Sequence, residues 1–350
     1  MYLASDNTSG VPEQVLAALT AANDGFALGY GADALMDRVR DKIRALFEAP
    51  EAAVYLVATG TAANSLAIAS YIQPWQTVYC HRHAHIEEDE CCAPEFYAGG
   101  AKLTLLDGAD AKIDADQLEQ GLASAPGGVH HVQKGLLSLT NITERGARYS
   151  VAEVTRLCAI AKAHGLPVHL DGARFSNAIV AEGCSPAEMT WKAGVDVVSF
   201  GGTKNGLMGV EAVVFFDPAK AWEFELRRKR GGHLFSKHRY LSAQMDAYLT
   251  DDLWRDLATT ANARAAALEA GLREAGARLV HPRGGNILFA EFPLKAHEAL
   301  RKAGAVYYDW PAPPPEGASP DHPHQCRLVA SWSTTEAHVA DFVEILKGAL

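Results

Sequence analysis

The chain has few of the features that mark membrane, secreted and nucleic-acid-binding proteins. No uninterrupted apolar run approaches the ~18 residues that a membrane-spanning helix requires, and residues 1–6 lack the basic region and apolar stretch of a signal peptide. Only 6 cysteines occur, none of them in a CxxC pair, which argues against a disulfide framework and favours a reducing cytoplasm. The formal net charge of −10 argues against nucleic acid or an anionic membrane as a partner.

Two familiar cofactor motifs are also missing. No G-x-G-x-x-G follows an early strand, which argues against a nicotinamide-dependent dehydrogenase. His81, His83 and His85 would share one face if their segment were a strand, and Cys91 follows soon after. The sequence has no HExxH, however, and residues 87–90 are better explained as a solvated or helix-starting charge run. We therefore expect no metal site.

Strand-like and helix-like stretches alternate from residue 53 to about residue 216. Continuous apolar strands separated by helices predict a mostly parallel sheet that is covered on both faces, in a large α/β domain. Ligand groups should then gather at the carboxyl ends of the strands. We expect strands at residues 53–57, 77–79, 102–106, 135–139, 167–170, 196–200 and 211–216, and helices at 62–72 and 150–164.

The C-terminal part of the chain predicts a smaller α+β domain. A long helical stretch should span about 240–275, and we divide the chain into a large domain at 1–245 and a small domain at 246–350. The proline-rich segment 311–323 should be a stiff surface loop, because a strand resumes after it. We expect strands at 286–290, 305–308 and 327–331, and helices near 295–303 and from residue 335.

The most informative residues are Lys204 and Asp171, which both come just after an apolar strand. Pyridoxal phosphate (PLP) chemistry needs such a pair. The lysine amine condenses with the aldehyde of the cofactor, and the carboxylate keeps the pyridine nitrogen protonated so that the ring can accept electrons. Either residue alone would be explained more simply, as a surface lysine or as a helix-capping aspartate. The two together predict a PLP site.

A glycine turn at Thr59–Gly60–Thr61 leads from the first strand into a helix. Free N–H groups and the dipole at a helix N-terminus bind phosphate. We assign the PLP phosphate to the backbone of Gly60, Thr61 and Ala62, with the Thr61 hydroxyl also available. Taken alone, such a turn is equally often an ordinary helix cap; Lys204 and Asp171 favour the phosphate.

Several short motifs occur in order along nearly the whole chain: Ser5-Asp6, Gly29-Tyr30-Gly31, the TGTAAN run at 59–64, Ala84-His85, the LLSL run at 136–139, Thr143-Glu144 with Gly146, the DGAR run at 171–174, the FGGTKNG run at 200–206 and Arg327-Leu328-Val329. Together they resemble the L-threonine aldolase family, in the branch with low-specificity and phenylserine-type enzymes. The resemblance implies a fold type I PLP-dependent enzyme, transferase-like in fold and close to the β-eliminating lyases. The DGAR run with a downstream lysine turn is the most specific of these motifs.

The resemblance also implies roles for residues around the cofactor. His85 would stack on the pyridine ring and move the proton of the substrate β-hydroxyl. His130 or His131 corresponds to a second family histidine near the aldehyde side; the spacing favours His130. Thr203 stands where many relatives have serine, and the hydroxyl is retained.

Further implied roles concern the substrate carboxylate and a neighbouring subunit. Arg174 is expected near the cofactor O3′ and the carboxylate, while Arg327 and Ser5 would hold the carboxylate itself. Tyr30 would enter the site of a neighbouring subunit in a homo-oligomer. The arginine that reaches the phosphate from the other subunit in relatives has no clear match; Lys237 is our candidate and Arg239 the alternative.

These observations predict an aldolase that cleaves L-threonine, L-allo-threonine or related β-hydroxy-α-amino acids, including phenylserine, to glycine and an aldehyde. A PLP-dependent β-eliminating lyase is the alternative among enzymes. A catalytically silent regulatory or binding protein with a PLP fold is the alternative outside them, and the intact lysine, aspartate and arginines count against it.

Overall fold

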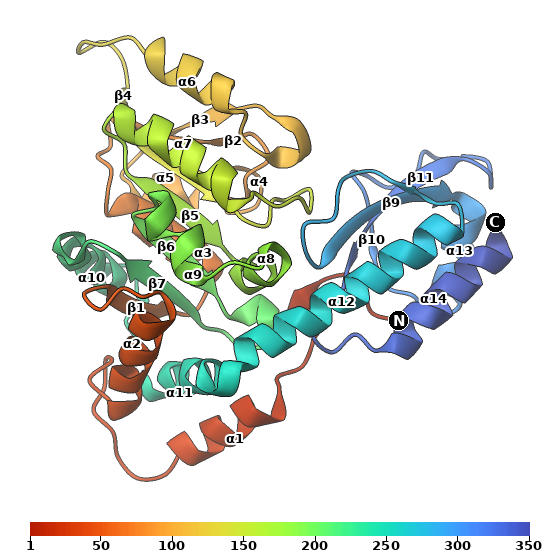
Figure 1. Ribbon diagram of the computed structural model, residues 1–350, viewed down its shortest axis with the longest axis horizontal. Helices are drawn as coiled ribbons and strands as arrows, with labels where there is room; N and C mark the ends of the chain where they lie inside the picture. The colour runs from red at the N-terminus through yellow and green to blue at the C-terminus, as the bar shows by residue number, and fades with distance from the viewer.

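The computed structural model describes residues 1–350, which form a larger lobe around a seven-stranded sheet and a smaller lobe around a four-stranded sheet (Figure 1). In the larger sheet the strand order is β1-β7-β6-β5-β4-β2-β3. Its strands are β1 (Ala53–Val57), β2 (Gln76–His81), β3 (Lys102–Leu106), β4 (Gln133–Thr140), β5 (Val168–Gly172), β6 (Val197–Gly201) and β7 (Glu211–Phe215).

The larger sheet is mostly parallel, as expected. Strands β3, β2, β4, β5 and β6 pair in parallel, and β7 alone runs antiparallel to its neighbours β6 and β1. Six of the seven strands therefore end at the same edge, and the turns that follow them meet there.

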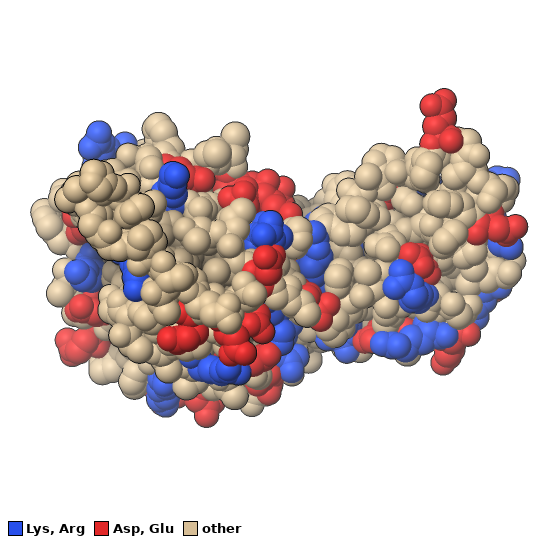
Figure 2. Space-filling model, turned by 90° about the horizontal axis from the view of Figure 1, so that it is seen from above, with Lys and Arg blue, Asp and Glu red and all other residues tan.

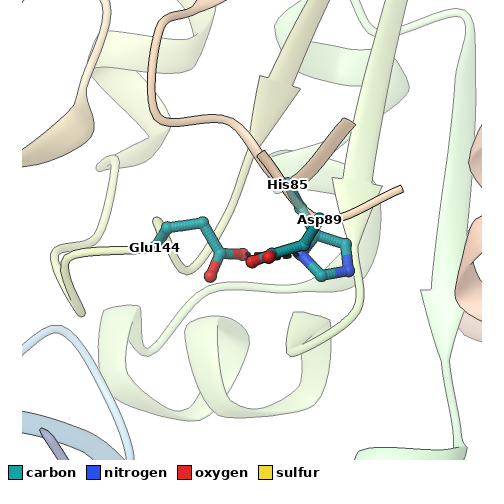
Figure 3. A group of neighbouring side chains, drawn as sticks. All are labelled: His85, Asp89 and Glu144. Carbon is teal, nitrogen blue, oxygen red and sulfur yellow. Dashed lines mark ion pairs between the residues drawn. The ribbon is translucent and has the colours of Figure 1, made fainter. Parts of the chain in front are cut away.

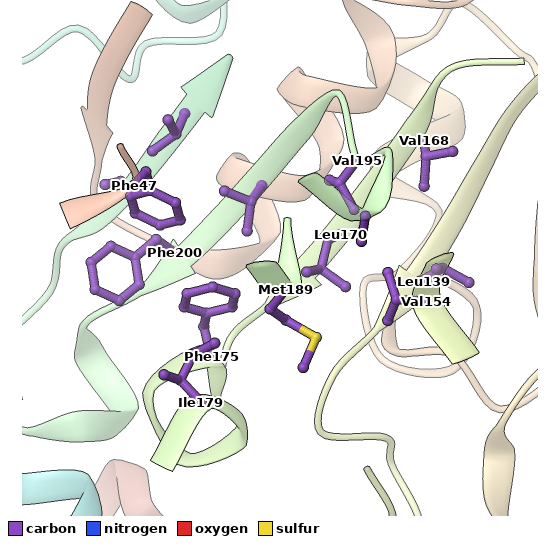
Figure 4. Close-up of a cluster of buried hydrophobic side chains, with 14 of the residues drawn as sticks. Phe47, Leu139, Val154, Val168, Leu170, Phe175, Ile179, Met189, Val195 and Phe200 are labelled. Carbon is purple, nitrogen blue, oxygen red and sulfur yellow. The ribbon is translucent and has the colours of Figure 1, made fainter. Parts of the chain in front are cut away.

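Helices cover both faces of the larger sheet, which explains why its strands are apolar at consecutive positions. Val197 and Val198 are adjacent in β6, yet they are buried in different hydrophobic clusters on opposite faces. In the larger cluster the rings of Phe47, Phe175 and Phe200 lie 5.6–5.7 Å apart (Figure 4).

The helices of the larger lobe are mostly short. They are α1 (Glu13–Ala22), α2 (Ala34–Leu46), α3 (Gly60–Ala69), α4 (His85–Glu88), α5 (Ala93–Tyr97), α6 (Ala115–Ala123), α7 (Val151–Ala163), α8 (Phe175–Glu182), α9 (Pro186–Met189), α10 (Ala221–Arg230) and α11 (Arg239–Tyr248). The predicted helix at 150–164 is confirmed as α7: the Ser150 hydroxyl accepts the Glu153 N–H, and the Glu153 carboxylate accepts the Ser150 N–H.

The smaller lobe has an antiparallel sheet of order β10-β11-β9-β8, and its core also includes residues of α12, α13 and α14. The first residues of the chain join this lobe, since the Leu3 N–H donates to the Val306 carbonyl and Leu3 is buried in its core. The elements of the smaller lobe are α12 (Leu253–Glu274), β8 (Arg278–Leu279), β9 (Ile287–Pro293), α13 (Leu294–Lys302), β10 (Tyr308–Asp309), β11 (Pro323–Val329) and α14 (Glu336–Ala349). The domain boundary between residues 245 and 246 stays a prediction.

Two sequence-based expectations about these elements are wrong. The long helix at 240–275 is interrupted between α11 and α12, where Asp251 and Asp252 have φ of 50° and 56°. Aspartate adopts this left-handed conformation more readily than most residues, so the Asp-Asp pair allows a break. The strand expected at 305–308 is reduced to β10 and an isolated bridge between Val306 and Tyr2.

Charged side chains of both signs are mixed on the face of the molecule seen in Figure 2. In Figure 2 the two lobes meet at a narrower waist, and acidic and basic side chains alternate over this face without one large patch of either sign. No helix is both long enough and apolar enough to span a bilayer.

A buried histidine links three strands of the larger sheet. In β5, His169 Nδ1 lies 3.0 Å from the Ser138 hydroxyl of β4, and its Nε2 lies 3.2 Å from the Ser199 hydroxyl of β6. Burial lowers the pKa of His169 to about 4, although Asp171 acts in the opposite direction. The imidazole is therefore neutral in the folded protein.

This depressed pKa predicts acid-sensitive stability. Between about pH 6.5 and 4 the unfolded chain binds a proton at His169 that the folded chain does not, so the free energy of unfolding falls as the pH falls. The maximal slope for one proton is about 1.4 kcal/mol per pH unit. His169→Gln should reduce the slope measured by urea unfolding across this range, whereas His131→Gln, at an exposed position, should leave it unchanged. Equal slopes for wild type and His169→Gln would contradict the assignment.

Candidate active site

Lys204 lies in a tight turn directly after β6. The turn packs so closely that glycine is required before it: a Cβ at Gly201 would lie 2.3 Å from the Ala173 carbonyl oxygen, and one at Gly202 would lie 2.6 Å from the Val210 carbonyl oxygen. The FGGTKNG run thus brings Lys204 against the turn that follows β5.

Two side chains brace the lysine turn. The Thr203 hydroxyl accepts the Val210 N–H at 3.2 Å, and the Glu211 carboxylate accepts the Gly202 N–H at 2.6 Å. Burial raises the pKa of Glu211 to about 7, against its hydrogen bonds and the charge of Lys204. Glu211 was not among the predicted site residues, although an acidic residue at the start of an apolar strand was a usable signal.

Asp171 lies near the end of β5, beside β6. Its Oδ1 accepts the Ala173 N–H at 3.0 Å, whereas its Oδ2 is buried and has no hydrogen-bond partner. A buried carboxylate oxygen without a donor is costly, so this atom is ready to accept a hydrogen bond from a bound group. The protonated pyridine nitrogen of PLP is a donor of the kind that Oδ2 needs.

A cavity of about 260 Å³ opens beside Lys204. Of the residues expected to contact the cofactor, it contains Gly60, Thr61, His85, Thr203 and Lys204. The full lining is Asn7, Ala58, Thr59, Gly60, Thr61, Asn64, His85, Ala173, Thr203, Lys204 and Glu211.

The N-terminus of α3 forms one wall of this cavity, but it offers fewer donors than expected. The Ala62 N–H already donates to the Thr59 hydroxyl at 3.1 Å, so its assignment to the phosphate is corrected. The N–H groups of Gly60 and Thr61 have no protein acceptor. The space beside Gly60 is open, since a Cβ added there would meet no atom within 4 Å. These two groups and the dipole of α3 fit a phosphate.

His85 begins α4 on another side of the cavity. Its Nδ1 is buried without a hydrogen bond, and the nearest acidic oxygens belong to Glu144 at 3.6 Å and Asp89 at 3.7 Å (Figure 3). His81, His83 and His85 do not share a strand face, because β2 ends at His81.

The acidic run 87–90 was predicted to be solvated or to start a helix, and Glu87 and Glu88 do lie in the first turn of α4, but Glu90 is buried. Glu90 is only 3% exposed, and its Oε1 accepts the Asn64 amide at 2.9 Å. Burial raises the pKa of Glu90 to about 8, and the charge of Asp171 adds to the rise. Glu90 therefore lies behind Asn64, which lines the cavity. Its place in an unbroken run of acidic residues gave no sign of this burial.

Arg174 and Asp6 form a buried ion pair next to the lysine turn. The Asp6 carboxylate accepts Arg174 Nε at 2.7 Å and Nη2 at 2.9 Å, and it also accepts the Asn286 amide at 3.0 Å. Burial would raise the pKa of Asp6, but the charge and hydrogen bonds of Arg174, together with Lys204, hold it below its ordinary value. Asp6 was quoted in a motif but was not expected to be a site residue.

The remaining expected carboxylate ligands lie around this pair. Ser5 caps the short turn that contains Asp6, and that turn packs on the lysine turn. Arg327 donates to the Ala4 carbonyl at 3.3 Å, while its Nε is buried without a partner. Burial and the nearby Arg174 lower the pKa of Arg327. Two arginines this close favour an anion between them.

Five expected site residues lie elsewhere on the chain. His130 and His131 are exposed and precede β4, whereas the cavity lies at the carboxyl ends of the strands. Tyr30, Lys237 and Arg239 gather on another surface, where the Tyr30 N–H donates to the Ser236 carbonyl at 3.2 Å. A single chain does not bring these residues to Lys204, so any role at the cofactor requires a neighbouring subunit.

Comparisons with known proteins agree with this geometry. The family model described as Beta-eliminating lyase matches residues 2–293. A low-specificity L-threonine aldolase from Pseudomonas sp. (strain NCIMB 10558) is 38% identical over 348 residues, which is 99% of this chain and 97% of the relative. The chain belongs to this family of lyases. The expected family, the fold type I α/β class and PLP as cofactor are confirmed, and the protein is a PLP-dependent carbon–carbon lyase.

Further relatives support the family and the fold. A low-specificity L-threonine aldolase from Pseudomonas aeruginosa is 39% identical over 345 residues, or 98% of this chain and 96% of the relative. The structure of a Leishmania major threonine aldolase superposes with a TM-score of 0.91 at 29% identity, covering 99% of this chain and 98% of that one. A serine palmitoyltransferase from S. paucimobilis with a bound PLP aldimine, at 19% identity, TM-score 0.69 and coverage of 100% of this chain and 87% of that one, shares the fold.

The buried ion pair predicts a large difference between two similar substitutions. Asp6→Asn should lower the free energy of unfolding by about 3–5 kcal/mol, because it leaves Arg174 buried without a counter-charge. Glu291→Gln is the matched control: it also removes a doubly hydrogen-bonded carboxylate, but its partner Arg278 is 58% exposed. Urea unfolding should show a much smaller loss for the control, and equal losses would contradict the importance of burial.

Proposed function

We propose that this protein cleaves L-β-hydroxy-α-amino acids to glycine and an aldehyde by a retro-aldol reaction, with L-threonine, L-allo-threonine and related compounds such as phenylserine as substrates. The observation that carries the proposal is the placement of Lys204 beside the unsatisfied Oδ2 of Asp171 at neighbouring strand ends. Similarity to low-specificity L-threonine aldolases over nearly the whole chain supports the same activity.

The cofactor, when bound, supplies an acceptor for the electrons of a bond broken at the substrate Cα. Lys204 provides the amine that holds the cofactor aldehyde, and Thr203 fixes the turn that carries it. Asp171 Oδ2 holds the proton on the ring nitrogen. Gly60 and Thr61 donate their backbone N–H groups to the phosphate.

The substrate carboxylate is bound between Arg327 and Arg174, with Ser5 at its side. Arg327 Nε is buried and free to donate, and a guanidinium can hold a carboxylate through two parallel hydrogen bonds. Arg174 is itself fixed by Asp6, so the position of the anion is set before the substrate arrives. Fixing the carboxylate decides which bond at Cα is broken.

His85 takes the proton from the β-hydroxyl group. Its imidazole borders the cavity, and a histidine can serve as a base near neutral pH. We propose that a homo-oligomer completes the site: Tyr30, Lys237 or Arg239, and His130 or His131 would then come from a neighbouring subunit. The small number of cysteines is consistent with a cytoplasmic enzyme.

The proposed activity is tested by a product panel. With PLP, the protein should release aldehyde and glycine from L-threonine, L-allo-threonine or phenylserine, and Lys204→Ala should release none, because no other amine lies at the end of β6. Release of pyruvate from cysteine or tryptophan without aldehyde formation would favour a β-eliminating lyase. If wild type releases neither product while it binds PLP, the protein is a silent binding protein.

The role of Asp171 is tested by removing its charge without changing its size. Asp171→Asn should still bind PLP but lose most of its kcat, because an amide does not hold the ring nitrogen protonated; about 2–4 kcal/mol of transition-state stabilisation is expected for such a partner. Asp196→Asn is the matched control, since Asp196 precedes β6 at the other edge of the sheet and pairs with Lys162. A near-normal kcat for Asp171→Asn would contradict the assignment.

A further inference from the structure

One acid beside His85 has no part in the steps above. Glu144 lies in the loop between β4 and α7, and its side chain is only 13% exposed. Its Oε1 lies 3.6 Å from His85 Nδ1, the ring nitrogen that has no hydrogen bond (Figure 3). The other ring nitrogen, Nε2, is left for a ligand.

The loop that carries Glu144 is braced on both sides. Asn141 donates to the Tyr149 carbonyl at 3.1 Å and accepts the Tyr149 N–H at 3.2 Å, which closes the base of the loop. Within it, the Gly146 N–H donates to the Thr143 carbonyl at 2.8 Å, and the Thr143 hydroxyl donates to the Asp110 carbonyl at 2.8 Å. Glu144 therefore stands on a fixed backbone, as a group that orients another must.

A second carboxylate competes for the same nitrogen. Asp89 Oδ2 lies 3.7 Å from His85 Nδ1, but the Asp89 side chain is 64% exposed. Water and salt screen an exposed charge, and an exposed side chain loses more conformational freedom when it is fixed. Glu144, at a similar distance and much less exposed, has the stronger electrostatic effect on His85.

We propose that Glu144 is the positioning residue of His85: its carboxylate accepts a hydrogen bond from Nδ1–H and so presents Nε2 to the β-hydroxyl group of the substrate. This inference rests on the proposed aldolase reaction. The separation of 3.6 Å is too long for a hydrogen bond, but the hydrogen bonds of catalytic groups commonly shorten when a ligand binds. A carboxylate in this position fixes the tautomer and stabilises the imidazolium that forms.

The proposed cleavage conserves atoms and charge. The β-hydroxyl proton moves to His85 Nε2, and the electrons of the O–H bond become the second bond of the aldehyde carbonyl. The Cα–Cβ bond breaks, and its electron pair stays with Cα, which takes up one proton to give glycine. His85 then returns its proton, so no net proton is consumed. While His85 carries two protons, the negative charge of Glu144 offsets its positive charge.

The test compares Glu144→Gln with Asp89→Asn. Both substitutions remove a charge near Nδ1 and keep the size of the side chain. For retro-aldol cleavage of phenylserine, Glu144→Gln should lower kcat by about 10- to 100-fold, the usual cost of losing a group that orients a functional histidine, with KM little changed. Asp89→Asn should stay near wild type. Glu144→Asp, which keeps the charge, should recover part of the loss.

Three further measurements separate positioning from other roles. Exchange of the glycine α-proton with solvent uses no β-hydroxyl, so Glu144→Gln should retain it. The ligand-free variant should keep its melting temperature, which excludes misfolding as the cause. In a crystal of the glycine complex, Glu144 should accept Nδ1 within about 3.2 Å.

Several outcomes would overturn the inference. A rise in KM alone would mean that Glu144 acts on Arg174 and Arg327, which bind the substrate carboxylate, and not on His85. An equal or larger loss with Asp89→Asn would make Asp89 the partner. His85, Asp89 and Glu144 also offer three ligand atoms within 4.8 Å of one another, so loss of activity with EDTA and its recovery with a divalent metal would identify a metal site instead. If the wild-type protein shows no aldolase activity, the proposed function is wrong, and the inference about Glu144 falls with it.

Discussion

The buried ion pair between Asp6 and Arg174 connects three parts of the chain at one point. Asp6 belongs to the N-terminal segment, Arg174 follows β5 of the larger sheet, and Asn286, which also donates to Asp6, precedes β9 of the smaller sheet. A buried pair persists only if both charges keep their partners. The relative position of the two lobes at the site therefore depends on this contact, and so does the orientation of the arginine proposed to bind the substrate carboxylate.

The chemistry of the site follows from the direction of the strands. Because β5 and β6 are parallel neighbours, Asp171 and Lys204 emerge at the same edge of the sheet although 204 − 171 = 33 residues separate them along the chain. The helix α3 points its N-terminus at the same edge and supplies the groups that fit a phosphate. The sheet thus brings an amine, an acid and a phosphate site together without a long loop.

The sequence predicted this arrangement well where the signal was periodic or local. The apolar strands, the capped helix at 150–164 and the glycine-rich lysine turn all depend on short-range chemistry. Prediction from sequence failed where burial depends on residues far apart in the chain. Glu90 was grouped with its three acidic neighbours, although it is buried. No residue near Asp6 in the sequence indicates that it pairs with Arg174, 168 residues away. The left-handed Asp251 and Asp252 broke a helix whose periodicity continued through them. His130, Tyr30 and Lys237 do not line the cavity of a single chain, so the roles proposed for them require a neighbouring subunit.

The central claim is that Lys204 holds the cofactor, and one measurement tests it most directly. The protein is incubated with PLP, reduced with sodium borohydride, digested and analysed by mass spectrometry to find which lysine carries the pyridoxyl phosphate group. The account predicts a single major modified peptide that contains Lys204, with the modification blocked in Lys204→Ala. Stoichiometric modification of another lysine, or none at saturating PLP, would contradict the account.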